Sequence, residues 1–291
     1  MHSRGKIPIA LSIAGSDSGG GAGVQADLKT FAALRVHGTS AITCVTAQSP
    51  VGVTGVQAVR AAIVKLQLEA IYAELRPSAV KTGMLFSEPI IRVVADHLSH
   101  HRDVPLVVDP VMVATSGARL LKRSAFQTLC ARLLPLATLI TPNVDEASWL
   151  LEREITTRED LRLAGRELHS RFGCAVLMKG GHLAAALAKS DDKTRPITIQ
   201  AIDFFFDGRL EIWHEARFIP HVSTHGTGCT LSAAIAAHLA HGKNLLDAVR
   251  LAKEDITRAI RNSVRCGRHD VLWPFNLNPA VHLTAKIAKN K

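Results

Sequence analysis

The sequence predicts an α/β fold in which helices cover both faces of a mainly parallel sheet. Short apolar runs alternate along the chain with longer segments of helical periodicity, starting with residues 7–15 and 23–38. Apolar residues make up 47% of the 291 residues and aromatic residues only 4%, which fits helices packed on a sheet better than a β-sandwich. No linker rich in Pro, Gly or Ser interrupts the chain, so we expect one domain over residues 1–291.

The elements follow in order from the same patterns. We expect strands at 7–15, 39–47, 78–84, 105–111, 138–142 and 174–180. We expect helices at 23–38, 61–75, 88–100, 123–137, from 144, at 159–173, 230–241 and 245–264, with a loop at 48–60. Gly173 is a plausible helix C-cap, and 201–215 contains two strand-like runs about an Asp-Gly turn. Residues 182–222 are less regular and form a flap or insertion, and 267–291 form a C-terminal tail.

Charge, cysteine content and hydropathy exclude several classes of protein. The net charge is +10, but Lys and Arg are spread along the chain outside the basic C-terminal end, and no aromatic–basic pattern indicates nucleic-acid binding. The five cysteines are scattered and form no CxxC pair, so neither a zinc site nor a disulfide framework is encoded. The apolar N-terminal run is short and enters a glycine loop, so we interpret it as a buried strand of a cytoplasmic protein without a membrane span.

Ligands of parallel sheets bind beyond the carboxyl ends of the strands. In this sequence a set of conspicuous side chains lies at or just after the predicted strand ends: Asp17, Gln48, Met84, Asp109, Asn143 and Lys179. We therefore expect these residues to share one binding site.

The motifs within this set leave more than one interpretation open. The glycine loop at 14–27 admits a small ligand to the backbone or is a plain strand-to-helix turn, since it matches neither GxxxxGK[ST] nor GxGxxG. Asp109 suits metal or phosphate chemistry, or caps a turn. Asn143 and Glu146 have the spacing of a site at a helix start, but also that of helix capping alone. Lys179 neutralises a phosphate or is a solvated lysine at a strand end.

A cysteine stands at the start of the helix in "HGTGCTL". Backbone amides of Gly226, Thr227 and Gly228 converge there, and such a nest binds anions and stabilises negative charge in a transition state. The helix dipole favours the thiolate of Cys229. A buried, inert cysteine is the alternative, and we expect it for the other four cysteines.

Taken together, these stretches resemble a family. In order and approximate spacing the chain is similar to the bacterial hydroxymethylpyrimidine and phosphomethylpyrimidine kinases of thiamin synthesis, from about residue 7 to residue 265. The motifs are "AGSDSGGGAGVQADLKTF", "TAQSPVGV", "KTGML", "VVDPVM", "TPNVDEASWLL", "LMKGGH" and "THGTGCTLSAA". The resemblance implies a three-layer α/β/α ribokinase-like fold and phosphorylation by ATP of 4-amino-5-hydroxymethyl-2-methylpyrimidine, then of its monophosphate to the diphosphate.

The resemblance also implies roles for residues. Cys229 corresponds to the catalytic base, and the amides of Gly226, Thr227 and Gly228 to the anion hole. The substrate pocket is implied to contain Gln48, which reads the polar edge of the pyrimidine, with Gly15, Asp27, Thr46 and Met84. The Mg-ATP phosphate side is implied to contain Asp109, Asn143, Glu146 and Lys179, with Asp109 and Glu146 as candidate Mg²⁺ ligands. A cytoplasmic homodimer is the expected state.

Several features depart from the family pattern. Ser223 replaces the Asn of the usual "NTHGTGC", which puts a hydrogen bond to the nucleotide in doubt, and "SGG" follows Asp17 where Pro-Ser is common. The 182–222 stretch is longer than expected, and the tail replaces a glycine-rich ending. The rival interpretations are a pyridoxal kinase on the same cysteine-type scaffold, a sugar or nucleoside kinase (which predicts Asp at position 229), a catalytically silent ligand-binding module and a nucleic-acid-binding protein.

Overall fold

The computed structural model describes residues 6–112, 121, 123–181, 200–220 and 225–273. Within these residues nine strands form one sheet in the order β3-β2-β1-β4-β5-β6-β7-β8-β9. The strands are β1 (Ile9–Asp17), β2 (His37–Ser49), β3 (Gly52–Ala58), β4 (Ala79–Thr82), β5 (Leu106–Val108), β6 (Leu139–Ile140), β7 (Ala175–Lys179), β8 (Gln200–Phe206) and β9 (Glu211–Arg217).

The six strands at the centre of the sheet, which lie in the order β2-β1-β4-β5-β6-β7, are parallel to one another. The edge strands β3, β8 and β9 pair antiparallel with their neighbours. All carboxyl ends of the parallel strands therefore point to the same edge of the sheet, as the sequence predicted.

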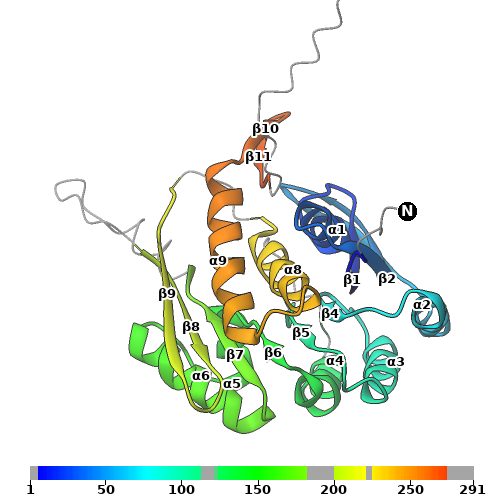
Figure 1. Cartoon of the computed structure of the whole chain (residues 1–291), viewed down its shortest axis with the longest axis horizontal. Helices are drawn as coiled ribbons and strands as arrows, with labels where there is room; N and C mark the ends of the chain where they lie inside the picture. Colours follow the sequence, from blue (N-terminus) through cyan, green and yellow to red (C-terminus); the bar gives the residue numbers. More distant parts are fainter. Residues whose placement is uncertain (1–5, 113–120, 122, 182–199, 221–224, 274–291) are drawn as a thin grey trace, which may run out of the picture.

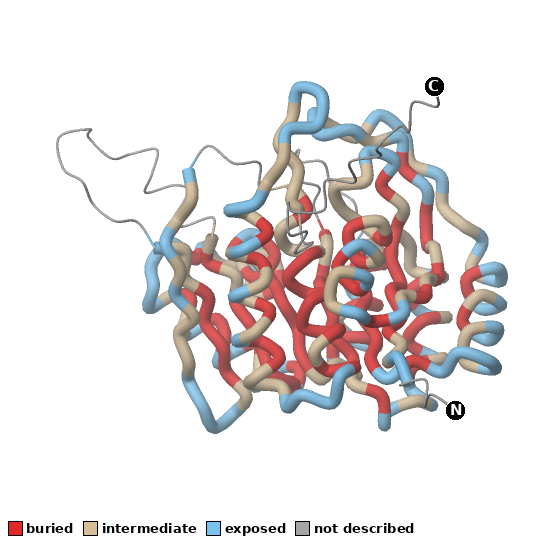
Figure 2. The backbone as a smooth tube through the Cα atoms, turned by 45° about the horizontal axis from the view of Figure 1, so that its top comes forward, coloured by how far each residue is buried: buried red, intermediate tan, exposed pale blue. Residues whose placement is uncertain are grey.

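Helices lie on both faces of this sheet and complete three layers (Figure 1). They are α1 (Gly23–Ala33), α2 (Ala61–Glu74), α3 (Glu88–Ser99), α4 (Arg123–Thr128), α5 (Val144–Leu151), α6 (Arg158–Phe172), α8 (Thr227–Ala240) and α9 (Leu245–Arg261). Apolar side chains of α2 to α6 form one core cluster with the sheet, and those of α1, α8 and α9 form the other. The most buried backbone accordingly runs through the middle of the molecule (Figure 2).

The alternating direction of strand side chains explains how one sheet serves both cores. Leu11 and Ile13 of β1 belong to the cluster of α2 to α6, whereas Ala10 belongs to the cluster of α8 and α9. Small, apolar side chains cover almost the whole circumference of α8. Its Ala residues let the helix pack closely on the sheet, on α1 and on α9. This close packing fixes the position of its amino end.

The structure differs from the predicted elements at several places. The predicted loop at 48–60 contains β3. Three of its residues face solvent and are polar or glycine, which weakens the apolar alternation that identifies a strand. The predicted helix at 123–137 is α4 followed by a π-helical turn (Leu129–Leu133) and a 3₁₀ turn (Leu134–Leu136), since Pro135 cannot donate to a regular helix. The predicted tail contains half of a small hairpin, β10 (Val264–Cys266) with β11 (His269–Val271).

Other local predictions are confirmed. Gly173 ends α6 in the left-handed conformation, with φ of 71°. The runs at 201–215 form the β8–β9 hairpin, and its turn contains Gly208 at φ of 95°. Of the predicted flap at 182–222, residues 182–199 and 221–222 lie outside the described residues, as do Ser223 and the tail from 274. No helix among the described residues is long and apolar enough to cross a membrane.

Candidate active site

A cavity of about 460 Å³ opens at the carboxyl edge of the parallel strands. Its lining includes all six side chains that the strand-end pattern singled out, namely Asp17, Gln48, Met84, Asp109, Asn143 and Lys179. It also includes Gly15, Thr46, Glu146, Gly226, Thr227, Gly228 and Cys229. Of the candidate site residues, only Asp27 is absent from this lining.

The amino end of α8 enters the cavity through a conformation that requires glycine. Gly226, the N-cap of α8, has φ of 81°, and a Cβ there would overlap the carbonyl oxygen of Gly21. A Cβ on Gly228 would lie 3.1 Å from Lys179 Nζ, so this glycine admits the ammonium close to the helix end. Gly226 makes no side-chain capping bond to the first turn, and the start of α8, from Gly226 to Cys229, lines the cavity.

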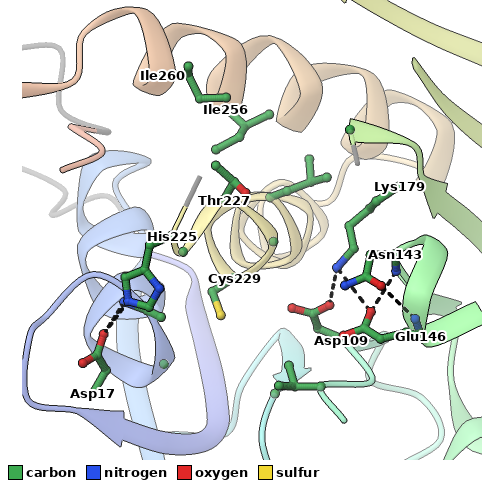
Figure 3. Close-up of a pocket in the computed structure, with 18 of the residues that line it drawn as sticks. Asp17, Asp109, Asn143, Glu146, Lys179, His225, Thr227, Cys229, Ile256 and Ile260 are labelled. Carbon is green, nitrogen blue, oxygen red and sulfur yellow. Dashed lines mark hydrogen bonds and ion pairs between the residues drawn. The ribbon is translucent and has the colours of Figure 1, made fainter. Parts of the chain in front are cut away.

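Cys229 lies in the middle of the cavity, between a polar group around Asp17 and a charged group around Lys179 (Figure 3). Burial raises the pKa of its thiol to about 11, although the ammonium of Lys81 and a hydrogen bond from the Gly23 amide favour the thiolate. The helix end, Lys81 and the Gly23 amide all favour the thiolate, but desolvation outweighs them, so the thiol pKa lies above its ordinary value.

A buried ion pair lies beneath the cavity. Lys81 Nζ donates to both carboxylate oxygens of Asp27, at 2.8 and 2.9 Å, and Ser12 donates to Oδ2 of the same carboxylate at 2.5 Å. Both charged side chains are fully buried, and Lys81 reaches the cavity wall whereas Asp27 does not. Burial raises the pKa of Asp27, and the Asp27 carboxylate raises that of Lys81 in spite of burial. The structure thus places Asp27 below the substrate pocket and not in its wall.

Lys179, at the end of β7, joins two carboxylates. Its Nζ donates to Asp109 Oδ1 at 2.7 Å and lies 3.9 Å from Glu146 Oε2. Thr141 also donates to Asp109 Oδ1, at 3.2 Å. Although burial opposes it, the charges of Lys179 and Lys81 lower the pKa of Asp109.

Glu146 interacts more weakly than Asp109 with the Lys179 ammonium. Burial raises its pKa to about 7, since Lys179 compensates it only in part and the Asp109 charge repels it. Asn143 and Glu146 also form a reciprocal capping box at the start of α5: each side chain accepts from the backbone N–H of the other, at 2.8 Å. The capping interpretation of this pair is confirmed, and both residues line the cavity as well.

This cluster fits Mg²⁺ by its donor chemistry. Asp109 and Glu146 supply carboxylate oxygens in excess of one ammonium, and Mg²⁺ is commonly held by one or two carboxylates plus water and substrate phosphates. Among the described residues no group of three or more His, Cys, Asp or Glu side chains is placed to hold a metal ion. The two carboxylates would therefore hold the ion only together with other oxygen ligands.

On the opposite side of the cavity, uncharged side chains lie beside the Asp17 carboxylate. Gln48 and Thr46 come from the end of β2, and Met84 follows β4. A Cβ on Gly15 would lie 2.7 Å from Sγ of the buried Cys44, so glycine is what allows these two residues to pack this closely. An apolar wall with one side-chain amide suits a small aromatic heterocycle.

Two functional side chains escaped the sequence interpretation. Lys81 lies within an apolar strand pattern, where a lysine is itself an unusual residue and the signal that could have found it. His225 directly precedes the glycine motif, and its Nε2 lies 3.2 Å from Asp17 Oδ2 across the cavity mouth (Figure 3).

With this geometry described, the chain was compared with known proteins. Residues 17–273 match the family model described as phosphomethylpyrimidine kinase. The chain is 46% identical over 264 residues to the hydroxymethylpyrimidine/phosphomethylpyrimidine kinase of Synechococcus elongatus, covering 90% of this chain and 95% of that protein. The fold and its strand-edge cavity are those of a small-molecule kinase of the ribokinase-like class. The chain belongs to the phosphomethylpyrimidine kinase family.

Solved structures agree with this class. A phosphomethylpyrimidine kinase from Clostridium difficile superposes with a TM-score of 0.74 at 40% identity, covering 88% of this chain and 100% of that chain. An ADP complex of Bacillus subtilis pyridoxal kinase superposes with a TM-score of 0.79 at 35% identity, covering 92% and 97%. The predicted fold class and the predicted resemblance are both confirmed.

Proposed function

We propose that this protein transfers the γ-phosphoryl group of ATP to the hydroxymethyl group of 4-amino-5-hydroxymethyl-2-methylpyrimidine, and then phosphorylates the monophosphate to the diphosphate. The observation that carries the proposal is the position of Cys229 at the amino end of α8, between the His225–Asp17 pair, which adjoins Gln48, and the ammonium of Lys179 (Figure 3). The family and the Synechococcus relative support the same substrates.

The residues of the cavity divide the reaction between them. Gln48 binds the polar edge of the ring, and the apolar wall at Gly15 and Met84 receives its face. Lys179 neutralises negative charge on the transferring phosphoryl group, and the first-turn amides of α8 stabilise the charge that develops there. Phosphoryl transfer depends on this positioning and neutralisation more than on covalent chemistry.

Cys229 accepts the proton of the substrate hydroxyl at Sγ. Only the thiolate accepts a proton, and Lys81, the helix end and the Gly23 amide are the groups that favour it. With a thiol pKa of about 11, Cys229 is mostly protonated at neutral pH and must lose its own proton to solvent before Sγ can accept the proton of the substrate hydroxyl. The hydroxyl oxygen then bonds to the γ-phosphorus as the bond from that phosphorus to the bridging oxygen of ADP breaks.

The phosphate side accommodates the nucleotide and its metal ion. Asp109 and Glu146 would hold Mg²⁺, which supplies charge neutralisation at the phosphates when bound. Structures of related kinases with ADP support the use of an adenine nucleotide. A cytoplasmic homodimer completes the proposal; light scattering after size exclusion would measure its mass.

Pyridoxal phosphorylation is the second candidate function, because the chain superposes on a pyridoxal kinase over 92% of its length. The test is turnover of the purified chain with Mg-ATP on three substrates: the hydroxymethylpyrimidine, its monophosphate and pyridoxal. We expect both pyrimidines to react and pyridoxal to lag well behind. Faster turnover of pyridoxal would move the assignment to the second candidate, and no turnover of any substrate would contradict both.

A further inference from the structure

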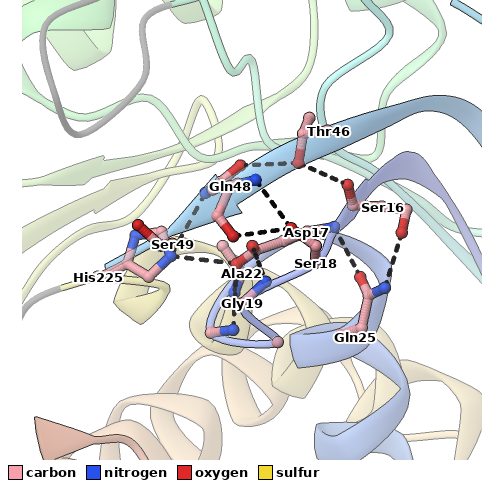
Figure 4. Close-up of polar contacts among 12 residues, drawn as sticks. Ser16, Asp17, Ser18, Gly19, Ala22, Gln25, Thr46, Gln48, Ser49 and His225 are labelled. Atoms are coloured by element: carbon pink, nitrogen blue, oxygen red, sulfur yellow. Dashed lines mark hydrogen bonds and ion pairs between the residues drawn. The ribbon is translucent and has the colours of Figure 1, made fainter. Parts of the chain in front are cut away.

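The side chain that reads the substrate ring is held in a network at the end of β2 (Figure 4). Ser18 fixes the backbone of Gln48: the Gln48 N–H donates to Ser18 Oγ at 2.8 Å, and the Ser18 hydroxyl donates to the Gln48 carbonyl at 2.7 Å. The register of β2 against β3 shifts at Ala47/Gln48, which directs the Gln48 side chain into the cavity. The place of the amide group is therefore fixed. Only its oxygen and its NH₂ group can still exchange positions, by rotation of the amide.

One end of the amide lies beside a hydroxyl whose only hydrogen is donated to another acceptor. Thr46 Oγ1 lies 2.8 Å from the carbonyl oxygen of Ser16 and 3.2 Å from Gln48 Oε1. The oxygen and nitrogen of a side-chain amide are told apart only by their hydrogen-bond partners, so the neighbours of Gln48 decide which end is which. A hydroxyl has a single hydrogen, and a carbonyl oxygen can only accept, so Thr46 donates to Ser16. Thr46 consequently turns a lone pair toward Gln48, and that lone pair is satisfied by the NH₂ end of the amide.

The other end meets an imidazole nitrogen that carries a hydrogen. His225 Nε2 lies 3.2 Å from Asp17 Oδ2 and 3.5 Å from Gln48 Nε2. Although burial opposes it, the hydrogen bonds to Asp17 from His225 and from the loop amides lower its pKa, so it is a carboxylate. A ring nitrogen beside a carboxylate is protonated in both the neutral and the charged imidazole, and its one hydrogen is donated to Asp17. The nitrogen therefore has no lone pair to accept from an amide NH₂, and the amide oxygen is the end that suits this position.

Both neighbours thus require the same orientation. We propose that His225, held by Asp17, fixes the Gln48 amide with its oxygen toward His225 and its NH₂ toward Thr46, and that this fixed orientation makes His225 a determinant of substrate specificity. The inference rests on the proposed function, since it assumes that Gln48 reads the substrate ring.

The two candidate substrates differ where this orientation matters. Next to the reacting hydroxymethyl group, the aminopyrimidine has an exocyclic amine, which donates, followed by a ring nitrogen, which accepts. Pyridoxal has a carbonyl, which accepts, at the equivalent position. A side-chain amide pairs with an amine and a ring nitrogen through both of its ends, as Asn and Gln do with adenine, and reversal of the amide mismatches both bonds. An amide locked in one orientation therefore separates the two rings.

The experiment uses a matched pair of variants in the full chain. His225→Gln places an amide nitrogen at the level of Nε2 and keeps a donor between Asp17 and Gln48, whereas His225→Asn places it nearer the backbone and loses that donor. We measure kcat and KM for the hydroxymethylpyrimidine and for pyridoxal. His225→Asn is expected to lower the ratio of the two kcat/KM values by about tenfold or more, mainly through KM, and His225→Gln to restore most of it.

The outcomes separate this inference from the proposed function. If wild-type protein does not phosphorylate the pyrimidine, the proposed function itself fails. If it does, but His225→Asn keeps the wild-type ratio within twofold, the role of His225 is refuted; equal losses in both variants refute it too, because they indicate packing. Thr46→Val, which removes the lone pair at the other end of the amide, provides an independent test should His225→Asn not fold. It is expected to lower the same ratio, and an unchanged ratio would overturn the inference.

Discussion

The Glu146→Gln substitution tests the excess of buried negative charge beside Lys179. Two carboxylates share this one ammonium: Asp109 binds it at 2.7 Å and Glu146 lies 3.9 Å away. Glutamine keeps the shape of the side chain and an oxygen that can accept from the Asn143 N–H, so the helix cap survives. The substitution therefore removes the less compensated charge and leaves an intact Asp109–Lys179 pair.

The pKa of Glu146 gives the size and the sign of the effect. Its rise from 4.5 to about 7 corresponds to roughly 3 kcal/mol at one pKa unit per 1.36 kcal/mol. Because the folded-state pKa is the higher one, the contribution of this group to stability is complete below pH 4.5 and is lost as the pH rises through about 7. Wild-type protein pays this penalty above pH 7, and Glu146→Gln does not.

Urea unfolding at pH 6 and at pH 8.5 measures the effect. The free energy of unfolding of Glu146→Gln, relative to wild type, is expected to be higher at pH 8.5 than at pH 6 by about 1–2 kcal/mol, since part of the penalty is already present at the lower pH. Glu154→Gln, at an exposed position, is the control and should show no such dependence. A Glu146→Gln difference that is the same at both pH values would refute the reasoning.

Three further predictions concern the Lys81–Asp27 ion pair beneath the cavity, the Gln48 amide and the Cys229 thiol. Lys81→Met leaves Asp27 buried without its cation and should lower the free energy of unfolding by about 3–5 kcal/mol, most of which Lys81→Met/Asp27→Leu should recover; a double variant no more stable than the single one would contradict this. Gln48→Ala should raise KM for the pyrimidine and blur its preference over pyridoxal, and unchanged substrate preference would remove the reading role. With iodoacetamide at pH 7.5, peptide mass spectrometry should find exposed Cys266 labelled at least about tenfold faster than Cys229, and preferential labelling of Cys229 would contradict its raised pKa.

The strand-end rule explains why so much of the cavity could be predicted from sequence. Asp109, Asn143 and Lys179 each follow an apolar run that could only be a buried strand, and parallel strands bring their carboxyl ends together whatever their order in the sheet. Gly226 of the α8 motif has a positive φ and a close backbone contact that leave no other residue type, whereas Gly228 leaves room beside the Lys179 ammonium.

Contacts between distant side chains were beyond this reasoning. Lys81 and Asp27 are 54 positions apart, and His225 and Asp17 are 208 apart, so no local pattern relates them. The same limit applies to the thiol: the helix end is readable from the sequence, but the burial that raises the pKa of Cys229 depends on packing from several elements. The edge strand β3 was missed because its glycines and polar residues weaken the alternation that identifies strands.

The most direct test of the proposed reaction combines turnover and binding for Cys229→Ala. Calorimetry measures the affinity for the hydroxymethylpyrimidine, and a coupled assay measures its phosphorylation by Mg-ATP. Because the thiol serves proton transfer, the variant is expected to bind the pyrimidine with an affinity within about threefold of wild type while kcat falls by about 10²–10⁴-fold. A Cys229→Ala variant with wild-type kcat would show that Cys229 is not the base and that the reaction does not depend on this thiol.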